Sequence, residues 1–167
     1  MVAISQPRAL VLTISDSASI GQRVDLSGPA AQEELDRLGC VVEGIEILPD
    51  DYEAIRGALT RHADRMEIDV IVTTGGTGLS PRDVTPEATE AVVDKLVPGI
   101  TELMRFEGFK STPRAALSRA VAGIRKSSLI INLPGSVKGV RECLGAVRPV
   151  LAHAVETLRQ SSLGCGE

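Results

Sequence analysis

Short apolar runs rich in β-branched residues recur along the chain, and segments with helical periodicity lie between them. Four of these runs predict strands, at residues 9–14, 41–48, 69–73 and 129–133. Glu43 and Glu46 place the second strand near an edge of the sheet. A further run at 122–126 is separated from the last strand by Ser127 and Ser128, which predicts a hairpin or two strands with a short turn. The alternation predicts an α/β fold of three layers, with a mostly parallel central sheet flanked by helices.

Apolar residues at helical spacing occupy the segments between the predicted strands. They predict helices from Pro29 to a stop at Gly39, from Tyr52 to Met66, from Pro86 through Leu96, and over 100–106, 114–121, 137–147 and 149–160. Pro98 and Gly99 are expected to break the third of these helices, and Leu163 to Glu167 to be disordered. No repeat or linker divides the 167 residues, so we expect a single domain with its core at about residues 8–158.

A glycine-rich segment follows the predicted strand at 69–73 and carries the strongest chemical signal in the chain. Gly75, Gly76 and Gly78 can adopt positive φ, and their N–H groups can form a concavity that binds an anion. Asp83 stands at the far end of the same loop. Because a carboxylate repels bound phosphates unless a cation lies between them, this pairing predicts Mg²⁺.

The glycine segment differs from both common phosphate-binding loops. It lacks the Gly-Lys-Ser/Thr of a Walker A loop and the third glycine of a dinucleotide-binding fingerprint. Thr85 as N-cap and Pro86 at the first helical position predict that a helix begins directly after the segment. A tight turn between strand and helix, without a ligand, is therefore the alternative.

Acidic and hydroxyl side chains follow the first two predicted strands. Asp16, Asp25 and Ser27 lie in a loop that is long for a strand-to-helix connection, and we expect this loop at the carboxyl edge of the sheet, where α/β proteins bind ligands. For Asp16 and Ser27 the alternative is a turn or cap role. Asp50 and Asp51 precede the next helix, and either one could simply cap it.

A second glycine turn lies at the end of the predicted strand 129–133. Pro134, Gly135 and Ser136 separate that strand from a helix, so N–H groups of the helix N-terminus would point at whatever lies there. Lys138 adds a positive charge to this end. The alternative is a plain turn with Lys138 in solvent.

The composition excludes several classes of function. A net charge of -4 and an aromatic content of 2% argue against a nucleic-acid partner, and no apolar run is long enough to span a membrane. Cys40, Cys143 and Cys165 are scattered and predict free thiols in a reducing compartment, and His62 and His153 form no zinc spacing. The N-terminus lacks the pattern of a secretory signal, so we expect a cytoplasmic protein.

The glycine segment resembles the signature of the molybdenum-cofactor biosynthesis domain family. The similarity rests on Thr-Thr-Gly-Gly-Thr-Gly at 73–78 and Arg-Asp-Val-Thr-Pro-Glu-Ala at 82–88. It extends to Asp-x-Ser-Gly-Pro at 25–29 and to Pro-Asp at 49–50, and it covers about residues 8–158. The family includes molybdopterin adenylyltransferases, domains of molybdate-inserting enzymes and domains attached to other nucleotide enzymes.

The resemblance implies transfer of AMP from ATP to the terminal phosphate of molybdopterin, with release of pyrophosphate and with Mg²⁺ as cofactor. Asp50 and Asp83 would be the catalytic acidic pair and hold the metal, while Arg82 would pair with Asp83 or with a neighbouring subunit. Nucleotide and phosphate binding is assigned to Thr74, Gly75, Gly76, Gly78 and Asp25, and substrate binding to Ser15, Ser27, Pro134, Gly135, Ser136 and Lys138. A homotrimer is expected. The alternatives are a non-catalytic molybdopterin-binding or scaffold protein, and a relative that hydrolyses nucleotides as a pyrophosphatase does.

Overall fold

A mixed sheet forms the centre of the molecule in the computed structural model, which describes residues 5–65 and 67–163. Its strands are β1 (Arg8–Ile14), β2 (Val41–Leu48), β3 (Val70–Thr74), β4 (Lys95–Leu96), β5 (Ala122–Arg125) and β6 (Ser128–Leu133). The order across the sheet is β2-β1-β3-β6-β5-β4. The pairs β1–β2, β1–β3 and β3–β6 are parallel, while β5–β6 and β4–β5 are antiparallel. The predicted α/β class, the hairpin and the edge position of the second strand are therefore confirmed.

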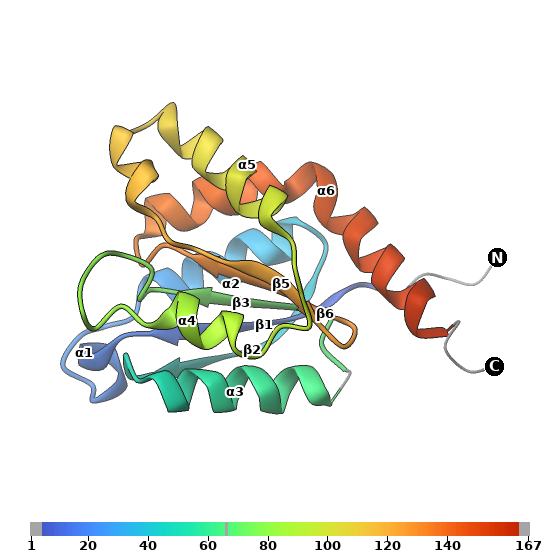
Figure 1. Cartoon of the computed structure of the whole chain (residues 1–167), viewed down its shortest axis with the longest axis horizontal. Helices are drawn as coiled ribbons and strands as arrows, with labels where there is room; N and C mark the ends of the chain where they lie inside the picture. Colours follow the sequence, from blue (N-terminus) through green and yellow to red (C-terminus); the bar gives the residue numbers. More distant parts are fainter. Residues whose placement is uncertain (1–4, 66, 164–167) are drawn as a thin grey trace.

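Helices cover both faces of this sheet (Figure 1). They are α1 (Asp16–Ser19), α2 (Ser27–Arg37), α3 (Tyr52–Asp64), α4 (Thr85–Glu90), α5 (Pro98–Phe109) and α6 (Val137–Leu163), with a 3₁₀ turn η1 (Pro113–Leu117). The apolar residues of α2, α5 and α6 pack in one core cluster, and those of α3 and α4 in another. Because β3 and β6 lie between the two clusters, every residue of both strands is buried. None of the described helices is both long and apolar enough to cross a membrane.

The helix predicted from Pro86 through Leu96 is much shorter than its apolar periodicity indicates. It ends at Glu90, and Leu96 lies in β4, where the residue is 57% exposed. The N–H groups of Asp94 and Val97 donate to the β5 carbonyls of Ile124 and Ala122. This pairing at the sheet edge satisfies backbone groups that a helix would otherwise have used, so tertiary context overrides the local pattern.

Two prolines act differently from the sequence prediction. Pro98 does not break a helix but begins α5, since proline at the first helical position loses no hydrogen bond. Pro149 lies inside α6, where two separate helices were predicted. A proline in a helix interior costs about 3 kcal/mol. Val147 and Leu151, on either side of Pro149, are both buried in the same core cluster, and this burial offsets the cost.

Smaller differences concern the ends of elements. The helix predicted over 114–121 is the 3₁₀ turn over Pro113–Leu117, and the long first loop contains the single turn α1. Leu163 ends α6, while the rest of the segment expected to be disordered, 164–167, lies outside the described residues, as does Met66. None of these differences moves the strands that position the site.

The sheet has a topological switch point between β1 and β3. From β1 the chain passes to β2 on one side and then to β3 on the other side. The parallel strands end together at the left of Figure 1, where α1 and the glycine loop lie. Ligands of open α/β sheets bind outside the carboxyl ends of strands at such a point.

Candidate functional site

A cavity of about 430 Å³ opens at the carboxyl ends of the parallel strands. Each strand around the switch point contributes a residue that follows it: Ser15 after β1, Asp50 after β2, Gly76 after β3 and Gly135 after β6. The remaining lining residues are Thr13, Ile14, Ala18, Arg23, Val24, Asp25, Leu26, Ser27, Ser136 and Val137. We call this space the switch-point cavity. It brings together residues from every loop that the sequence marked as a candidate.

The glycine loop begins where the backbones of three strands converge. Gly75 has φ of +107°, and a Cβ atom there would lie 2.3 Å from the carbonyl oxygen of Ile14. On the other side, a Cβ atom on Gly135 would lie 3.3 Å from the Cα atom of Gly75. Only a residue without a side chain fits this position, because both the dihedral angle and the approach exclude one.

Thr74 and Gly75 connect this loop to the end of β6. The Thr74 hydroxyl donates to the carbonyl of Pro134 at 2.9 Å, and the Gly75 N–H donates to the carbonyl of Leu133 at 3.1 Å. The hydroxyl of Thr74 and the N–H of Gly75 are thus occupied in the structure, although both residues were predicted to bind phosphate. Gly76, with φ of +64°, is the loop glycine that lines the switch-point cavity.

Gly78 has a different environment from the one predicted. It does not adopt positive φ, but a Cβ atom there would lie 2.9 Å from Oδ2 of Asp83. That oxygen accepts a hydrogen bond from the Ser80 N–H at 2.8 Å. The glycine therefore allows the Asp83 carboxylate to fold back against its own loop.

Thr85 forms hydrogen bonds with the glycine loop and does not cap α4. The structure places Val84 at the N-cap, without a side-chain hydrogen bond, so the predicted cap role of Thr85 is wrong. The buried Thr85 hydroxyl donates instead to the carbonyl of Gly75 at 3.0 Å, and its N–H donates to the carbonyl of Gly76 at 3.2 Å. The Thr89 hydroxyl in turn donates to the Thr85 carbonyl and accepts from Nδ2 of Asn132 in β6, which links the loop to the sheet interior.

Thr85→Val is expected to destabilise the protein by about 1–3 kcal/mol, because the carbonyl of Gly75 loses its buried donor while the side-chain volume stays similar. Urea unfolding measures the loss, and hydrogen exchange at residues 74–76 should accelerate with it. An unchanged free energy of unfolding would show that this hydrogen bond does not hold the loop.

Asp50 and Asp51 have different positions despite being neighbours. Asp51 is the N-cap of α3, and its carboxylate accepts from the Ala54 N–H at 2.8 Å. Asp50 lines the switch-point cavity, and its Oδ2 accepts from the Asp16 N–H at 2.9 Å. In return Oδ1 of Asp16 accepts from the Asp50 N–H at 2.9 Å. The cap role considered for Asp50 belongs to Asp51, and Asp50 is directed to the site.

Asp16 also joins the glycine loop to this acidic turn. Arg82 donates to Oδ2 of Asp16 through Nη2 at 2.6 Å, so the predicted pairing of Arg82 with Asp83 within one chain is wrong. Asp16 therefore connects the loops that follow β1, β2 and β3. Its hydrogen bonds with Arg82 and with the N–H of Asp50 hold its pKa below the usual range.

Burial raises the pKa of Asp50, and the nearby carboxylates of Asp16 and Asp83 add to the effect. A raised pKa in the folded state means that ionising Asp50 costs stability, and the cost is present only above the pH at which the carboxyl ionises. Asp50→Asn is therefore expected to raise the melting temperature at pH 7, with the gain shrinking as the pH falls toward about 4. Thermal unfolding of both proteins across this range tests it, and a lower melting temperature for the variant at pH 7 would contradict it.

Asp50 and Asp83 approach the glycine loop from its two ends, and they are the two residues predicted to hold Mg²⁺. A Cβ atom on Gly76 would lie 3.2 Å from Oδ1 of Asp50, just as one on Gly78 would lie beside Asp83. In the described part of the chain, Oδ1 of neither carboxylate accepts a hydrogen bond, and no cluster of three or more His, Cys, Asp or Glu residues could hold a metal alone. Mg²⁺ commonly uses one or two carboxylates together with water and substrate phosphates, so this pair fits it.

Asp25, Ser27 and Ser15 line the switch-point cavity but also have structural partners. Oδ1 of Asp25 accepts from the N–H groups of Ser27 and Gly28, both at 3.0 Å, and Oδ2 accepts from the Thr13 hydroxyl at 2.7 Å. The Ser15 hydroxyl accepts from the Ala18 N–H at the start of α1. These contacts agree with the turn and cap alternative for Ser27. The Asp25 carboxylate accepts from the Ser27 and Gly28 N–H groups in the first turn of α2.

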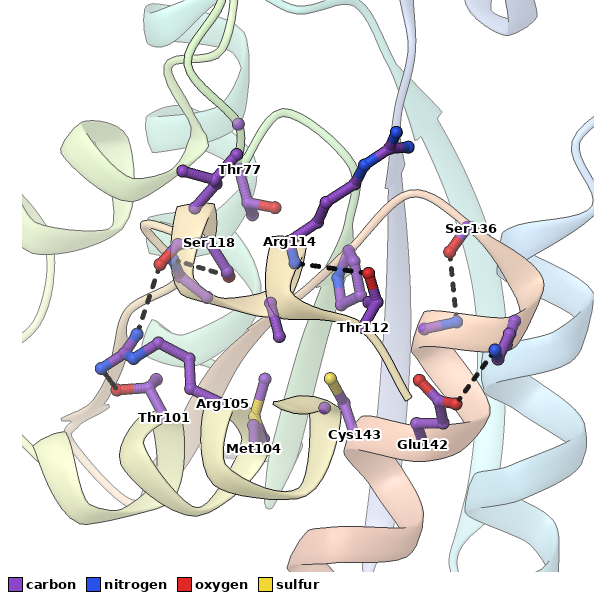
Figure 2. Close-up of a pocket in the computed structure, with 18 residues that line it drawn as sticks. Thr77, Thr101, Met104, Arg105, Thr112, Arg114, Ser118, Ser136, Glu142 and Cys143 are labelled. Carbon is purple, nitrogen blue, oxygen red and sulfur yellow. Dashed lines mark hydrogen bonds and ion pairs between the residues drawn. The ribbon is translucent and has the colours of Figure 1, made fainter. Parts of the chain in front are cut away.

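A second cavity of about 320 Å³ lies between α5, η1 and the start of α6 (Figure 2). Its lining residues are Thr77, Gly78, Thr101, Met104, Arg105, Gly108, Thr112, Arg114, Ala115, Leu117, Ser118, Ala120, Pro134, Ser136, Lys138, Gly139, Glu142 and Cys143. We call it the α5–α6 cavity. The predicted substrate residues of the second glycine turn line one cavity or the other, and Ser136 lines both: they are Pro134, Gly135, Ser136 and Lys138. The other two predicted substrate residues, Ser15 and Ser27, line the switch-point cavity.

The α5–α6 cavity combines an apolar region with polar groups. Met104 and Cys143 lie between the two helices, and Arg105 donates to the Thr101 hydroxyl at 3.2 Å (Figure 2). Nζ of Lys138 lies 3.7 Å from Oε1 of Glu142. Sequence reasoning missed Thr101, Arg105 and Arg114, since no motif marks them and only the fold brings η1 against α5.

The thiols and histidines described by the structure have no metal-binding arrangement. Burial raises the pKa of Cys40 to about 11 and that of Cys143 to about 12, so both thiols stay protonated near neutral pH. Nε2 of His62 lies 2.7 Å from Oε2 of Glu46, within hydrogen-bond distance. Cys165 lies outside the described residues. The prediction of free thiols is confirmed for Cys40 and Cys143.

Comparisons with known proteins identify the family of this chain. Residues 10–153 match a family described as "Probable molybdopterin binding domain". The chain belongs to this family. A molybdopterin adenylyltransferase from Helicobacter pylori is 49% identical over 150 residues, which is 89% of this chain and 85% of the relative. A molybdopterin adenylyltransferase from Escherichia coli K12 is 40% identical over 147 residues, 87% of this chain and 75% of the relative.

Solved structures of the family have the same fold. The molybdopterin biosynthesis enzyme MoaB from Thermus thermophilus superposes with a TM-score of 0.86 at 49% identity. The match covers 92% of this chain and 96% of that one. The resemblance drawn from the glycine segment is therefore confirmed at the level of the family.

Proposed function

We propose that this protein is a molybdopterin adenylyltransferase, which transfers AMP from ATP to the terminal phosphate of molybdopterin and releases pyrophosphate. The observation that carries the proposal is the meeting of Gly76 and Asp50 in the switch-point cavity, with Asp83 at the other end of the same loop. Relatives with 49% and 40% identity over most of the chain have this activity in their names, which supports it.

The reaction is an in-line displacement at phosphorus. An oxygen of the molybdopterin phosphate attacks the α-phosphorus of ATP, the bond to the bridging oxygen of pyrophosphate breaks, and that oxygen keeps the electron pair. Because the attacking phosphate is already ionised near neutral pH, no general base is required. The protein supplies alignment and neutralisation of charge.

The chain's residues are assigned roles on this basis. The backbone at Gly76 approaches the nucleotide phosphates closely, whereas Gly78 lines the α5–α6 cavity. Asp50 and Asp83 would hold Mg²⁺ directly or through water. The metal, when bound, neutralises charge that develops on the phosphate oxygens. Thr74 and Gly75 act through the fixed shape of the loop, and Asp25, Ser15 and Ser27 shape the wall of the nucleotide site.

The two cavities suit two substrates that must meet. ATP occupies the switch-point cavity beside Asp50, and the pterin occupies the α5–α6 cavity with its apolar floor. Ser136 lines both, so the pterin phosphate lies at the border, near the N-terminus of α6 and Lys138. Pro134 and Gly135 form the turn that separates the two spaces.

We further propose a homotrimer in the cytoplasm, with no nucleic-acid or membrane partner. Phe106, Phe109 and Leu117 are each more than half exposed on α5 and η1, which supports burial of this region between copies. Light scattering coupled to size exclusion tests the assembly. A stable monomer at working concentration would remove it without affecting the assignment of activity.

Pyrophosphate release from ATP and Mg²⁺, measured with and without molybdopterin, tests the function. Release that requires the pterin is expected. Release without the pterin would favour the hydrolase alternative. Pterin binding with no release under either condition would favour the non-catalytic binding or scaffold protein.

A further inference from the structure

Arg119, just before β5, makes contacts with the loop that carries Asp83 at both of its ends. Its Nε donates to the carbonyl of Gly78 at 2.7 Å, and its Nη2 donates to the carbonyl of Asp83 at 2.7 Å. The N–H of Arg119 also donates to the carbonyl of Thr77 at 3.0 Å. One residue thus holds both ends of the turn between the glycine segment and α4.

The rest of the guanidinium connects this turn to the following helix. Nη1 of Arg119 forms an ion pair with Glu87 in the first turn of α4. The side chain of Arg119 is 35% exposed, so it is partly shielded from solvent. A planar guanidinium with several donors in fixed directions suits two carbonyls and one carboxylate, whereas a lysine ammonium does not hold that geometry.

On the side of Asp83 the same turn also contacts Asp16 through Arg82, but this ion pair is exposed to solvent and such pairs contribute little. The Asp83 carboxylate bonds to Ser80 within the same turn, and the turn itself is exposed at Ser80, Pro81 and Arg82. Loops with few buried contacts open at low free energy, so the position of Asp83 depends on the contacts at the ends of its turn.

We infer that Arg119 is a positioning residue that fixes the turn over residues 77–83 and thereby places the Asp83 carboxylate beside the glycine loop. The importance of that placement for AMP transfer rests on the proposed function, whereas the anchoring itself does not. Because Thr77 and Gly78 also form a wall of the α5–α6 cavity, the same residue couples that wall to the acidic pair.

Arg119→Lys tests the inference, since it keeps the charge but not the fork of donors. Hydrogen exchange of the amides at 77–83 is expected to accelerate. The kcat of pterin-dependent pyrophosphate release is expected to fall by about tenfold or more, with the KM for ATP changing by less than about threefold, because misplacement affects alignment more than binding.

Arg125→Lys is the matched control. Arg125 donates to both oxygens of Asp64 at 2.9 Å and to the carbonyl of Val92 at 2.8 Å, and it lines neither cavity. This variant should leave exchange at 77–83 and kcat within about twofold of the wild type. Melting temperatures of both variants monitor folding.

Unchanged exchange at 77–83 in Arg119→Lys would overturn the anchoring, and equal kcat values in the two lysine variants would overturn the positioning role. Failure of the wild type to release pyrophosphate with molybdopterin would instead refute the proposed function. The exchange measurement would then still decide whether Arg119 fixes the turn.

Discussion

Asp50→Asn is expected to lower the kcat of AMP transfer on the order of a hundredfold, because it removes one of the two carboxylates that face the glycine loop. Asparagine still accepts the hydrogen bond from the Asp16 N–H, so the turn keeps its shape. The loss should therefore appear in turnover and in the Mg²⁺ concentration that half-saturates the rate, and initial-rate measurements across Mg²⁺ concentrations quantify both.

Asp51→Asn is the control for this experiment. Asp51 is the neighbour of Asp50 and carries the same charge, which the same substitution removes. Asparagine is as good an N-cap as aspartate, so α3 should remain intact and kcat should stay within about twofold. Equal losses in the two variants would mean that general charge near α3 matters, rather than the carboxylate in the cavity.

Gly75→Ala is expected to cause the largest loss of stability among single substitutions in the glycine loop. A side chain at φ of +107° is strained, and its Cβ atom would meet the Ile14 carbonyl at 2.3 Å. The strain costs about 1–2 kcal/mol, and displacement of the packed backbone adds about 1–3 kcal/mol. Urea unfolding measures the total, and nucleotide binding should weaken because the loop must move.

Gly39→Ala separates the two contributions. Gly39 has φ of +84°, but a Cβ atom there would meet nothing within 4 Å. The free energy of unfolding of this variant should therefore fall only by the cost of the strained dihedral angle, and its nucleotide binding should be unchanged. If Gly39→Ala destabilised the protein as much as Gly75→Ala, the close approach of β1 to the glycine loop would not be the cause.

The sequence was sufficient to predict the central strands and the loops that follow them. β3 and β6 are buried on both faces, so they appear as continuous apolar runs that need no knowledge of their partners. The rule that ligands bind at carboxyl ends predicted the position of the loop with Asp25 and Ser27. The glycine segment marked Gly76 and the family resemblance marked Asp50, and all four residues line the switch-point cavity. These features are local, and local patterns determine them.

The hydrogen bonds that shape the site could not be predicted in this way. Arg119 and Gly78 are 41 positions apart, and Thr74 and Pro134 are 60 apart, so only the folded chain shows that they meet. Thr85 has the sequence position of an N-cap, yet its hydroxyl finds a buried carbonyl in the glycine loop. Leu96 fits a helical stripe, but pairing with β5 determines its conformation.

Direct detection of the product is the measurement that tests the central claim most strictly. ATP labelled in the α-phosphate would be incubated with the protein, Mg²⁺ and molybdopterin, and the pterin would then be separated by chromatography. The account predicts label on the pterin in amounts equal to the pyrophosphate released, and its near absence with Asp50→Asn. Label appearing only as free AMP, with the pterin unlabelled, would contradict it.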